Sequence, residues 1–256
     1  MPDDPKTLCP HHPMLNQSHS HFLLGLLPGL AILTLSAQAG EKNPIGSAAP
    51  ADSPSLQPVW RDLADTKFYV LPAGEVDVRL RGNFAWFPED PAEQAFLPEV
   101  SIGLPGRFQL TLQDEAVHTK ADGLNQAAFF TELRWALAPW GHIPSNPTFG
   151  LGYEAVKGNQ DVLKASLYLG EQFDEKWLWA GSFTYQKRLG GDRELELIGK
   201  MGLHYILIQD SLTIGAEAKF EAASNNEPGN KTVTEFLIGP ALMWRISERT
   251  VYSFPG

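Results

Sequence analysis

Apolar and polar residues alternate along residues 194–221, in two runs separated by Gln209-Asp210. Side chains of a strand point alternately to its two faces, so each run predicts a strand with one apolar and one charged face. The intervening dipeptide predicts a tight turn, and the two runs together predict a hairpin. The apolar positions are Leu195, Leu197, Gly199, Met201, Leu203 and Tyr205, then Leu212, Ile214, Ala216, Ala218 and Phe220.

The same alternation recurs along most of the chain at hairpin spacing, without a convincing helical period. It predicts about ten strands, separated by polar and glycine-containing connections. Asp114–Asn125 is expected to be one of the longer loops, and Gly158-Asn159 a tight turn. The expected strands cover Val76–Phe87, Leu97–Gly103, Arg107–Gln113, Phe129–Leu137, Phe149–Glu154, Leu163–Leu169, Trp177–Gln186, the two runs described above, and Phe236–Arg245.

An apolar face opposite a charged face fits two all-β architectures. A water-soluble sandwich packs the apolar face into a core, whereas an outer-membrane barrel turns it to lipid and keeps charge in its lumen. Aromatic residues on the apolar face favour the barrel, because aromatic girdles form at membrane interfaces. The expected girdle consists of Trp135, Trp177, Trp179, Tyr185 and Trp244. The sequence therefore predicts an antiparallel up-and-down transmembrane β-barrel of about 10–12 strands, with a soluble periplasmic β protein as the alternative.

The lengths of the connections also fit an outer-membrane barrel, in which periplasmic turns are short and outer loops longer. If the first strand runs outward, three of the five outer connections are long and four of the five inner ones are short. Thr250–Phe254 then begins a further outward strand, which would leave an unsatisfied edge in lipid. Either ten strands close the barrel and this tail is loose, or about two final strands are missing; we favour the second alternative.

Residues 1–39 have the organisation of an export signal. Phe22–Leu35 is an apolar core, and Ala37-Gln38-Ala39 is a small-residue cleavage pattern. A start at Met14 would shorten this segment, and a membrane anchor is the alternative interpretation. Cleavage after Ala39 would remove Cys9, the one cysteine of the chain, so the mature protein would have no disulfide.

Two further parts follow the export signal. Residues 40–74 begin with a stretch rich in Ala, Pro and Ser, which predicts a flexible periplasmic lead-in. Residues 75–256 are expected to form the barrel, truncated at its C-terminus. Export and the barrel pattern together predict the cell outer membrane as the location, with outer-membrane lipid as a partner.

Composition and charge narrow the function. The formal net charge of -10 and the pI of about 5.1 disfavour nucleic acid as a partner. The histidine-rich stretch before the apolar core lies in the segment that cleavage removes, so it does not predict a metal site. No phosphate loop, dinucleotide fingerprint or nucleophile elbow is present. We therefore expect no cofactor and no enzymatic activity; His204, the one candidate for a catalytic base, is interpreted as structural.

Charged residues occupy the face opposite the apolar one, which is the lumen wall of the predicted barrel. They are interpreted either as ion pairs between neighbouring strands or as determinants of selectivity for passing solutes. The expected register places Lys200 opposite Lys219, with Glu196 and Glu217 as diagonal acidic neighbours. The complete set of candidates is Glu132, Arg134, Glu154, Lys164, Glu194, Glu196, Lys200, Glu217, Lys219, Glu235 and Arg245.

Several strand and turn segments are similar to bacterial outer-membrane β-barrels near the meta-pathway phenol-degradation transporter family. They are PEVSIGLPGRFQLTL, ELRWALAPWGHIPSNPTFGLGYE, TIGAEAKFE and FLIGPALMWRISER, and together they extend over Leu97–Trp244 and the residues just beyond. The resemblance implies a porin-like channel for small or aromatic molecules, inserted by the barrel-assembly machinery. Such barrels usually end on an aromatic residue, whereas this sequence ends in Phe254-Pro255-Gly256. The alternative function is a non-conducting structural or binding barrel, with its lumen packed by its own charges and by residues 40–74.

Overall fold

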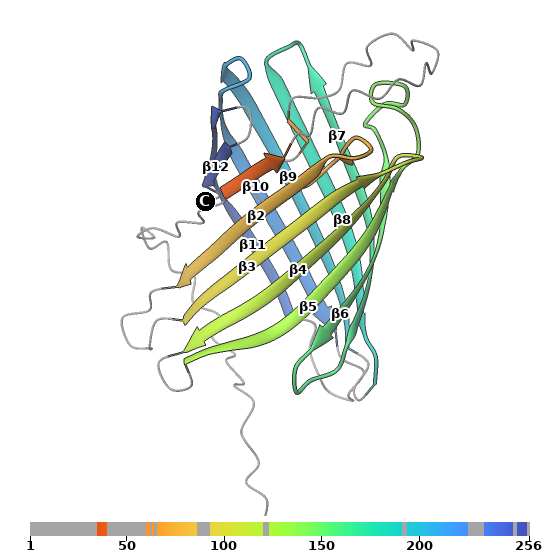
Figure 1. The fold of residues 1–256 in the computed structure, drawn as a ribbon, viewed down its shortest axis with the longest axis vertical. Helices are drawn as coiled ribbons and strands as arrows, with labels where there is room; N and C mark the ends of the chain where they lie inside the picture. Colours follow the sequence, from red (N-terminus) through yellow and green to blue (C-terminus); the bar gives the residue numbers. More distant parts are fainter. Residues whose placement is uncertain are drawn as a thin grey trace, which may run out of the picture.

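The computed structural model describes residues 35–39, 60–61, 63, 66–85, 93–119, 123–190, 194–224, 233–247 and 250–254 of the 256-residue chain. The strands of this part form one antiparallel sheet that curls around an interior (Figure 1). No helix among the described residues is long and apolar enough to cross a membrane. The ten long strands are β2 (Val76–Ala85), β3 (Glu93–Leu104), β4 (Phe108–Thr119), β5 (Gly123–Ala136), β6 (Thr148–Val156), β7 (Val162–Phe173), β8 (Trp177–Arg188), β9 (Leu195–Ile208), β10 (Leu212–Ser224) and β11 (Val233–Ser247).

Successive strands from β2 to the short β12 (Thr250–Phe254) are antiparallel neighbours in the sheet. This order confirms the prediction of an all-β, up-and-down fold. Three short turns, at residues 105–107, 174–176 and 209–211, lie at one end of the sheet, here called the turn end (upper in Figure 1). The connection at residues 157–161 lies at the opposite end, here called the loop end.

A five-residue strand, β1 (Leu35–Ala39), lies between β2 and β12. It pairs with β2 through five residue pairs and with β12 through two, so the order of strands returns to its start. This strand coincides with the end of the predicted export signal. Cleavage after Ala39 would therefore separate β1 from the chain that forms the rest of the sheet.

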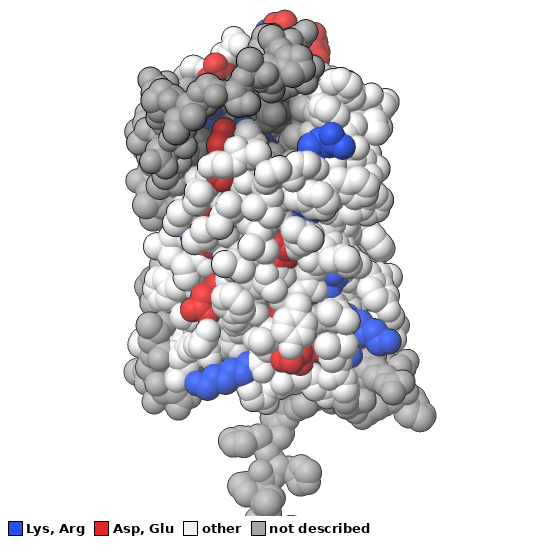
Figure 2. Space-filling view, turned by 45° about the vertical axis from the view of Figure 1, so that its right-hand side comes forward, with Lys and Arg blue, Asp and Glu red and all other residues white. Residues whose placement is uncertain are grey.

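The two faces of the sheet differ as the alternation predicts. On β9, Met201 is 63% exposed, whereas His204 is completely buried. On β8, Phe183 is 52% exposed and Leu178 is completely buried. Figure 2 shows one side of the molecule, where uncharged residues predominate and charged ones are scattered. The apolar positions of residues 194–221 therefore face outward, and the charged positions face the interior.

The prediction of a long loop at Asp114–Asn125 is wrong, because both flanking strands are longer than predicted. β4 continues to Thr119, and β5 begins at Gly123. The pairing of these strands shifts by one residue after Glu115, which is a β-bulge. The extra residue is Ala127 of β5, which exchanges the faces on which the side chains of β5 lie and so hides the alternation at the start of this strand.

Replacement of Gly215 by alanine should destabilise the sheet. An added Cβ would lie 2.2 Å from the carbonyl oxygen of Leu203 and 2.5 Å from Cδ2 of His204. We expect Gly215→Ala to lower the free energy of unfolding, measured by urea titration of the folded protein, by about 1–3 kcal/mol.

Gly199→Ala is the matched control on the neighbouring strand. Its added Cβ would approach nothing closer than Cβ of Phe220, at 4.0 Å, so the expected change is within about 0.5 kcal/mol. Equal effects of the two substitutions would contradict the described pairing of Gly215 with His204.

Candidate functional site

The interior at the turn end contains the chain that precedes β2. This part of the chain is here called the interior segment, and its described residues are Trp60, Arg61, Leu63 and residues 66–71. Residues 40–59, the start of the expected flexible lead-in, lie outside the described residues. The interior segment, which follows them, is packed against the inner wall of the sheet. Its buried apolar residues are Trp60, Leu63, Phe68, Tyr69, Val70 and Leu71. The wall residues of the same apolar cluster are Ala136, Leu178, Ala180, Ile206, Ala241 and Met243.

Glycines in the wall make room for this segment. A Cβ added at Gly170 of β7 would lie 2.6 Å from Cβ of Phe68, and one at Gly202 of β9 would lie 2.5 Å from Cδ1 of Leu63. Glycine weakens a strand, and its presence there often marks the close approach of another part of the chain. The wall is therefore shaped to accept the interior segment.

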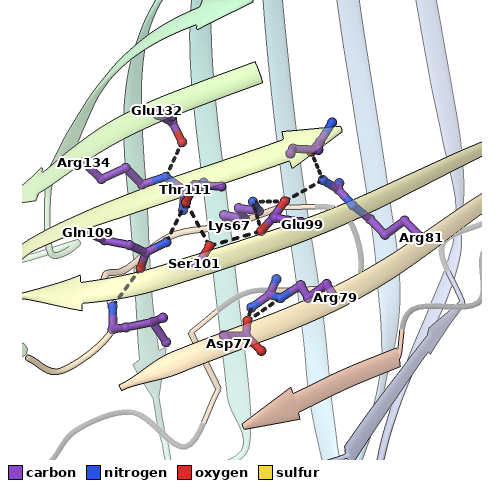
Figure 3. A network of polar contacts seen from close by, with 12 residues as sticks. Lys67, Asp77, Arg79, Arg81, Glu99, Ser101, Gln109, Thr111, Glu132 and Arg134 are labelled. Atoms are coloured by element: carbon purple, nitrogen blue, oxygen red, sulfur yellow. Dashed lines mark hydrogen bonds and ion pairs between the residues drawn. The ribbon is translucent and has the colours of Figure 1, made fainter. Parts of the chain in front are cut away.

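A buried ion pair joins the interior segment to β3 (Figure 3). The Lys67 ammonium donates hydrogen bonds of 2.5 and 2.6 Å to the two carboxylate oxygens of Glu99. Arg81 of β2 donates to the same carboxylate at 2.8 Å and to Gln113 at 2.6 Å. The side chain of Glu99 is only 1% exposed, and a carboxylate at such a depth requires charged partners.

Gln109 of β4 provides a second attachment for the interior segment. Its side-chain Oε1 accepts a 2.8 Å hydrogen bond from the backbone N–H of Leu71, and its Nε2 donates to Thr111 at 3.1 Å. Thr111 in turn shares a 2.9 Å hydrogen bond with Ser101 of β3. These contacts continue the polar network across two neighbouring strands (Figure 3).

Two more ion pairs lie along the same wall. Arg134 and Glu132 of β5 are 2.5 Å apart at their closest atoms, and the Tyr168 hydroxyl donates to Glu132 at 2.5 Å. Arg79 and Asp77 of β2 are also paired at 2.5 Å. This wall therefore combines many charges with few exposed polar atoms, and the charges neutralise one another locally.

The electrostatics of the interior segment show what its burial costs. Burial lowers the pKa of Lys67 to about 8, an effect that Glu99 opposes and that Arg134 and Arg81 reinforce. Burial also raises the pKa of Tyr69, whose hydroxyl donates a 2.8 Å hydrogen bond to the carbonyl of Ala138. The charged form of Lys67 is thus destabilised here relative to water, and its ion pair offsets this only in part.

The two ends of the interior differ in the cavities that the described residues line. The cavity beside Lys67 and Glu99 has a volume of about 10 Å³. A larger cavity of about 300 Å³, here called the loop-end pocket, lies at the opposite end against the inner wall of β6–β9. Its lining consists of Glu154, Val156, Asn159, Gln160, Val162, Lys164, Gln186, Arg188, Glu194 and Glu196.

The structure divides the charged residues predicted from sequence between these two regions. Glu132 and Arg134 belong to the close-packed wall, and Arg245 lies over the ring of Trp60 with its guanidinium carbon 4.6 Å from the ring centroid. Glu235 lies on β11 towards the loop end. Four candidates line the loop-end pocket: Glu154, Lys164, Glu194 and Glu196.

The remaining candidates lie on the hairpin of β9 and β10. Lys200 is directly opposite Lys219, as the expected register requires. Lys219 forms an ion pair with Glu221, a residue that the sequence did not single out. Glu217 contacts the ring of His204 instead, so the diagonal pairing expected from sequence does not describe all of its contacts.

Sequence reasoning missed the buried ion pair itself. The alternation of β2 already placed Asp77, Arg79 and Arg81 on the charged face, so a signal for these residues existed. Glu99 follows the same rule in β3. Lys67 had no such signal, because the interior segment is not a strand of the sheet and its contacts depend on the tertiary structure.

His204 is part of a buried polar row. Its Nδ1 lies 3.0 Å from Thr213 Oγ1, and its Nε2 lies 3.2 Å from Glu217 Oε1. The order of hydroxyl, imidazole and carboxylate resembles a nucleophile with its base. His204 and Thr213 are, however, completely buried, so a substrate could not reach them, and the row is better explained as a contact between β9 and β10. Among the described residues, no group of three or more His, Cys, Asp or Glu could hold a metal ion.

No protein-family model matches this chain, and no curated protein matches it at a significant level.

Removal of the buried carboxylate should destabilise the protein strongly. Glu99→Gln would leave Lys67 and Arg81 facing a neutral group, and we expect the free energy of unfolding to fall by about 3–5 kcal/mol. The measurement is urea titration of the folded protein. The double variant Glu99→Gln, Lys67→Met should lose less free energy of unfolding than the sum of the two single variants, because both substitutions disrupt one ion pair.

Glu175→Gln, in the exposed turn at residues 174–176, is the matched control with an expected change within about 0.5 kcal/mol. Strict additivity of the Lys67 and Glu99 substitutions would show that these two side chains are not coupled.

Proposed function

We propose that this protein is an exported outer-membrane barrel that admits small polar solutes, with a lumen closed at the turn end by the interior segment. The single observation that carries the closed lumen is the position of Phe68 and Lys67 inside the curled sheet. Phe68 is completely buried, and Lys67 is bound by Glu99 on the wall. Passage through the barrel would require the interior segment to move.

Two rows of outward aromatic residues support a position in the membrane. On β8, Trp177 belongs to one row and Tyr185 to the other, and on β11 the same holds for Trp244 and Phe236. Along each of these strands the two rows are about eight residues apart. At about 3.4 Å per residue and a strand tilt of about 40°, this spacing is about 20 Å along the barrel axis. It is close to the apolar band of about 25 Å that aromatic girdles flank in outer-membrane barrels.

Aliphatic residues fill the outward surface between these rows. Leu151 lies between Phe149 and Tyr153 on β6 and is 71% exposed. Ile238 on β11 is 70% exposed. A soluble β protein would need a second apolar surface to cover such residues, and lipid covers them without one.

The orientation follows from the connections. Short turns are typical of the periplasmic side, so we place the turn end in the periplasm and the loop end outside the cell. The closure is then on the periplasmic side, and the loop-end pocket is open to solutes from outside. Its lining is polar and charged, which favours polar solutes over the aromatic ones that the family resemblance implies.

A permanently closed barrel is the second candidate function. It is favoured by the close fit between Phe68 and Gly170, which resembles a core more than a loose plug. The cost of burying charged Lys67 favours the movable segment instead. Conductance measurements distinguish the two functions.

Membrane placement predicts a dependence on depth for new charges. Leu151→Lys would put an ammonium near the middle of the apolar band and should lower the free energy of unfolding in lipid vesicles by about 2–4 kcal/mol. Ala155→Lys, on the same outward face of β6 but nearer the loop end, is the control and should cost at most about 1 kcal/mol. Equally small effects at the two positions would indicate a water-exposed surface.

A disulfide between the interior segment and the wall should control conductance. In a Cys9→Ser background, Phe68→Cys and Gly170→Cys would place two Cβ atoms near one another, starting from 2.6 Å between Cβ of Phe68 and the added Cβ of Gly170. A shift of about 1 Å reaches disulfide geometry. We expect the oxidised protein to be closed in planar bilayers and the reduced protein to show an increased open probability.

The single variants Phe68→Cys and Gly170→Cys, with and without reductant, are the controls for each substitution. Equal conductance in the oxidised and reduced double variant would reject gating by the interior segment. Absence of conductance in the reduced protein, despite a folded barrel, would favour the permanently closed alternative.

A further inference from the structure

The charges of the loop-end pocket are unequal. Lys164 lies 2.5 Å from Glu154, and Arg188 lies 3.1 Å from Glu194. Each of the two cations of the lining therefore faces a carboxylate of the same lining. Glu196 is the third carboxylate of the pocket, and no third cation belongs to the described lining.

Glu196 faces a neutral amide, a second carboxylate and the ammonium of Lys219, and that ammonium is already paired with the second carboxylate, Glu221. The side-chain amide of Gln186 donates a 2.7 Å hydrogen bond to it, and Glu221 of β10 shares a further hydrogen bond with it. Two carboxyl groups can form such a bond only when one of them carries a proton. Glu221 also forms an ion pair with Lys219, which favours its charged form. A cation beside Glu196 could take the place of that shared proton.

The rest of the pocket suits an organic cation. Val156 and Val162 add apolar surface to the lining, and the volume of about 300 Å³ is at the lower end of the range for small-molecule sites. The three carboxylates of the pocket do not converge on one point, since no described group of three His, Cys, Asp or Glu is placed to hold a metal ion. A small ammonium compound needs only one carboxylate for its charge and an apolar surface for its carbon atoms.

We infer that the loop-end pocket binds a small organic ammonium cation, with Glu196 as its counter-ion. Val156 and Val162 contact the alkyl part of this cation, and the Gln186 amide orients the Glu196 carboxylate. The inference rests on the proposed function, because it names the class of solute that enters the same lumen. It predicts preference for cations over anions of the same size.

Binding can be tested without conductance. The full-length protein, folded in detergent, is titrated with butylammonium, and binding is followed by ligand-observed NMR; butyrate is the anion of similar size. We expect saturable binding of butylammonium, little binding of butyrate, and affinity at least about tenfold weaker in Glu196→Gln. Glu196→Asp, which keeps the charge, should restore part of the affinity.

Glu175→Gln, with the same loss of charge at the turn end, should bind butylammonium as the wild type does. Equal affinity of wild type and Glu196→Gln, equal binding of butyrate, or no binding to the folded wild type would each overturn the inference. Because binding is measured directly, a barrel that binds without conducting contradicts only the channel function, and one that conducts without binding contradicts only the ammonium site.

Discussion

The ion pair between Lys67 and Glu99 is the contact on which the closed end of the interior depends. Glu99 is buried on β3, and Arg79 and Arg81 lie on the neighbouring strand β2. This wall therefore contains a buried carboxylate next to buried cations. Lys67 is the cation that comes from outside the sheet. Arg81 of the wall binds the same carboxylate, so Lys67 joins the interior segment to an electrostatic network that the wall already contains.

The interior is divided into two halves of different physical character. Towards the turn end, apolar side chains of the interior segment pack on small and aliphatic wall residues, with only about 10 Å³ left near the ion pair. Towards the loop end, the wall is polar and leaves a pocket of about 300 Å³. The nine described residues of the interior segment therefore pack against the wall of only one half of the interior.

Much of the fold could be predicted because the alternation of side chains has a single period. The register that placed Lys200 opposite Lys219 followed from a turn at Gln209-Asp210, and the structure has this pairing. The prediction failed where the period is broken, as at the bulge after Glu115. The candidate site was predicted only as a set of inward charges. Which of them are joined depends on Lys67 and Phe68, whose positions inside the sheet no local pattern of the sequence encodes.

The strand β1 has a consequence for chain direction. Because β1 is antiparallel to both of its neighbours, β2 and β12 run in the same direction. Two strands of equal direction cannot be joined by a hairpin turn, and an even-membered antiparallel ring cannot place them side by side. Any polypeptide that fills the seam between them must therefore contribute an odd number of strands. Leu35–Ala39 meets this condition as a single strand, and because the predicted cleavage site follows Ala39, cleavage there would take away the strand that lies in the seam.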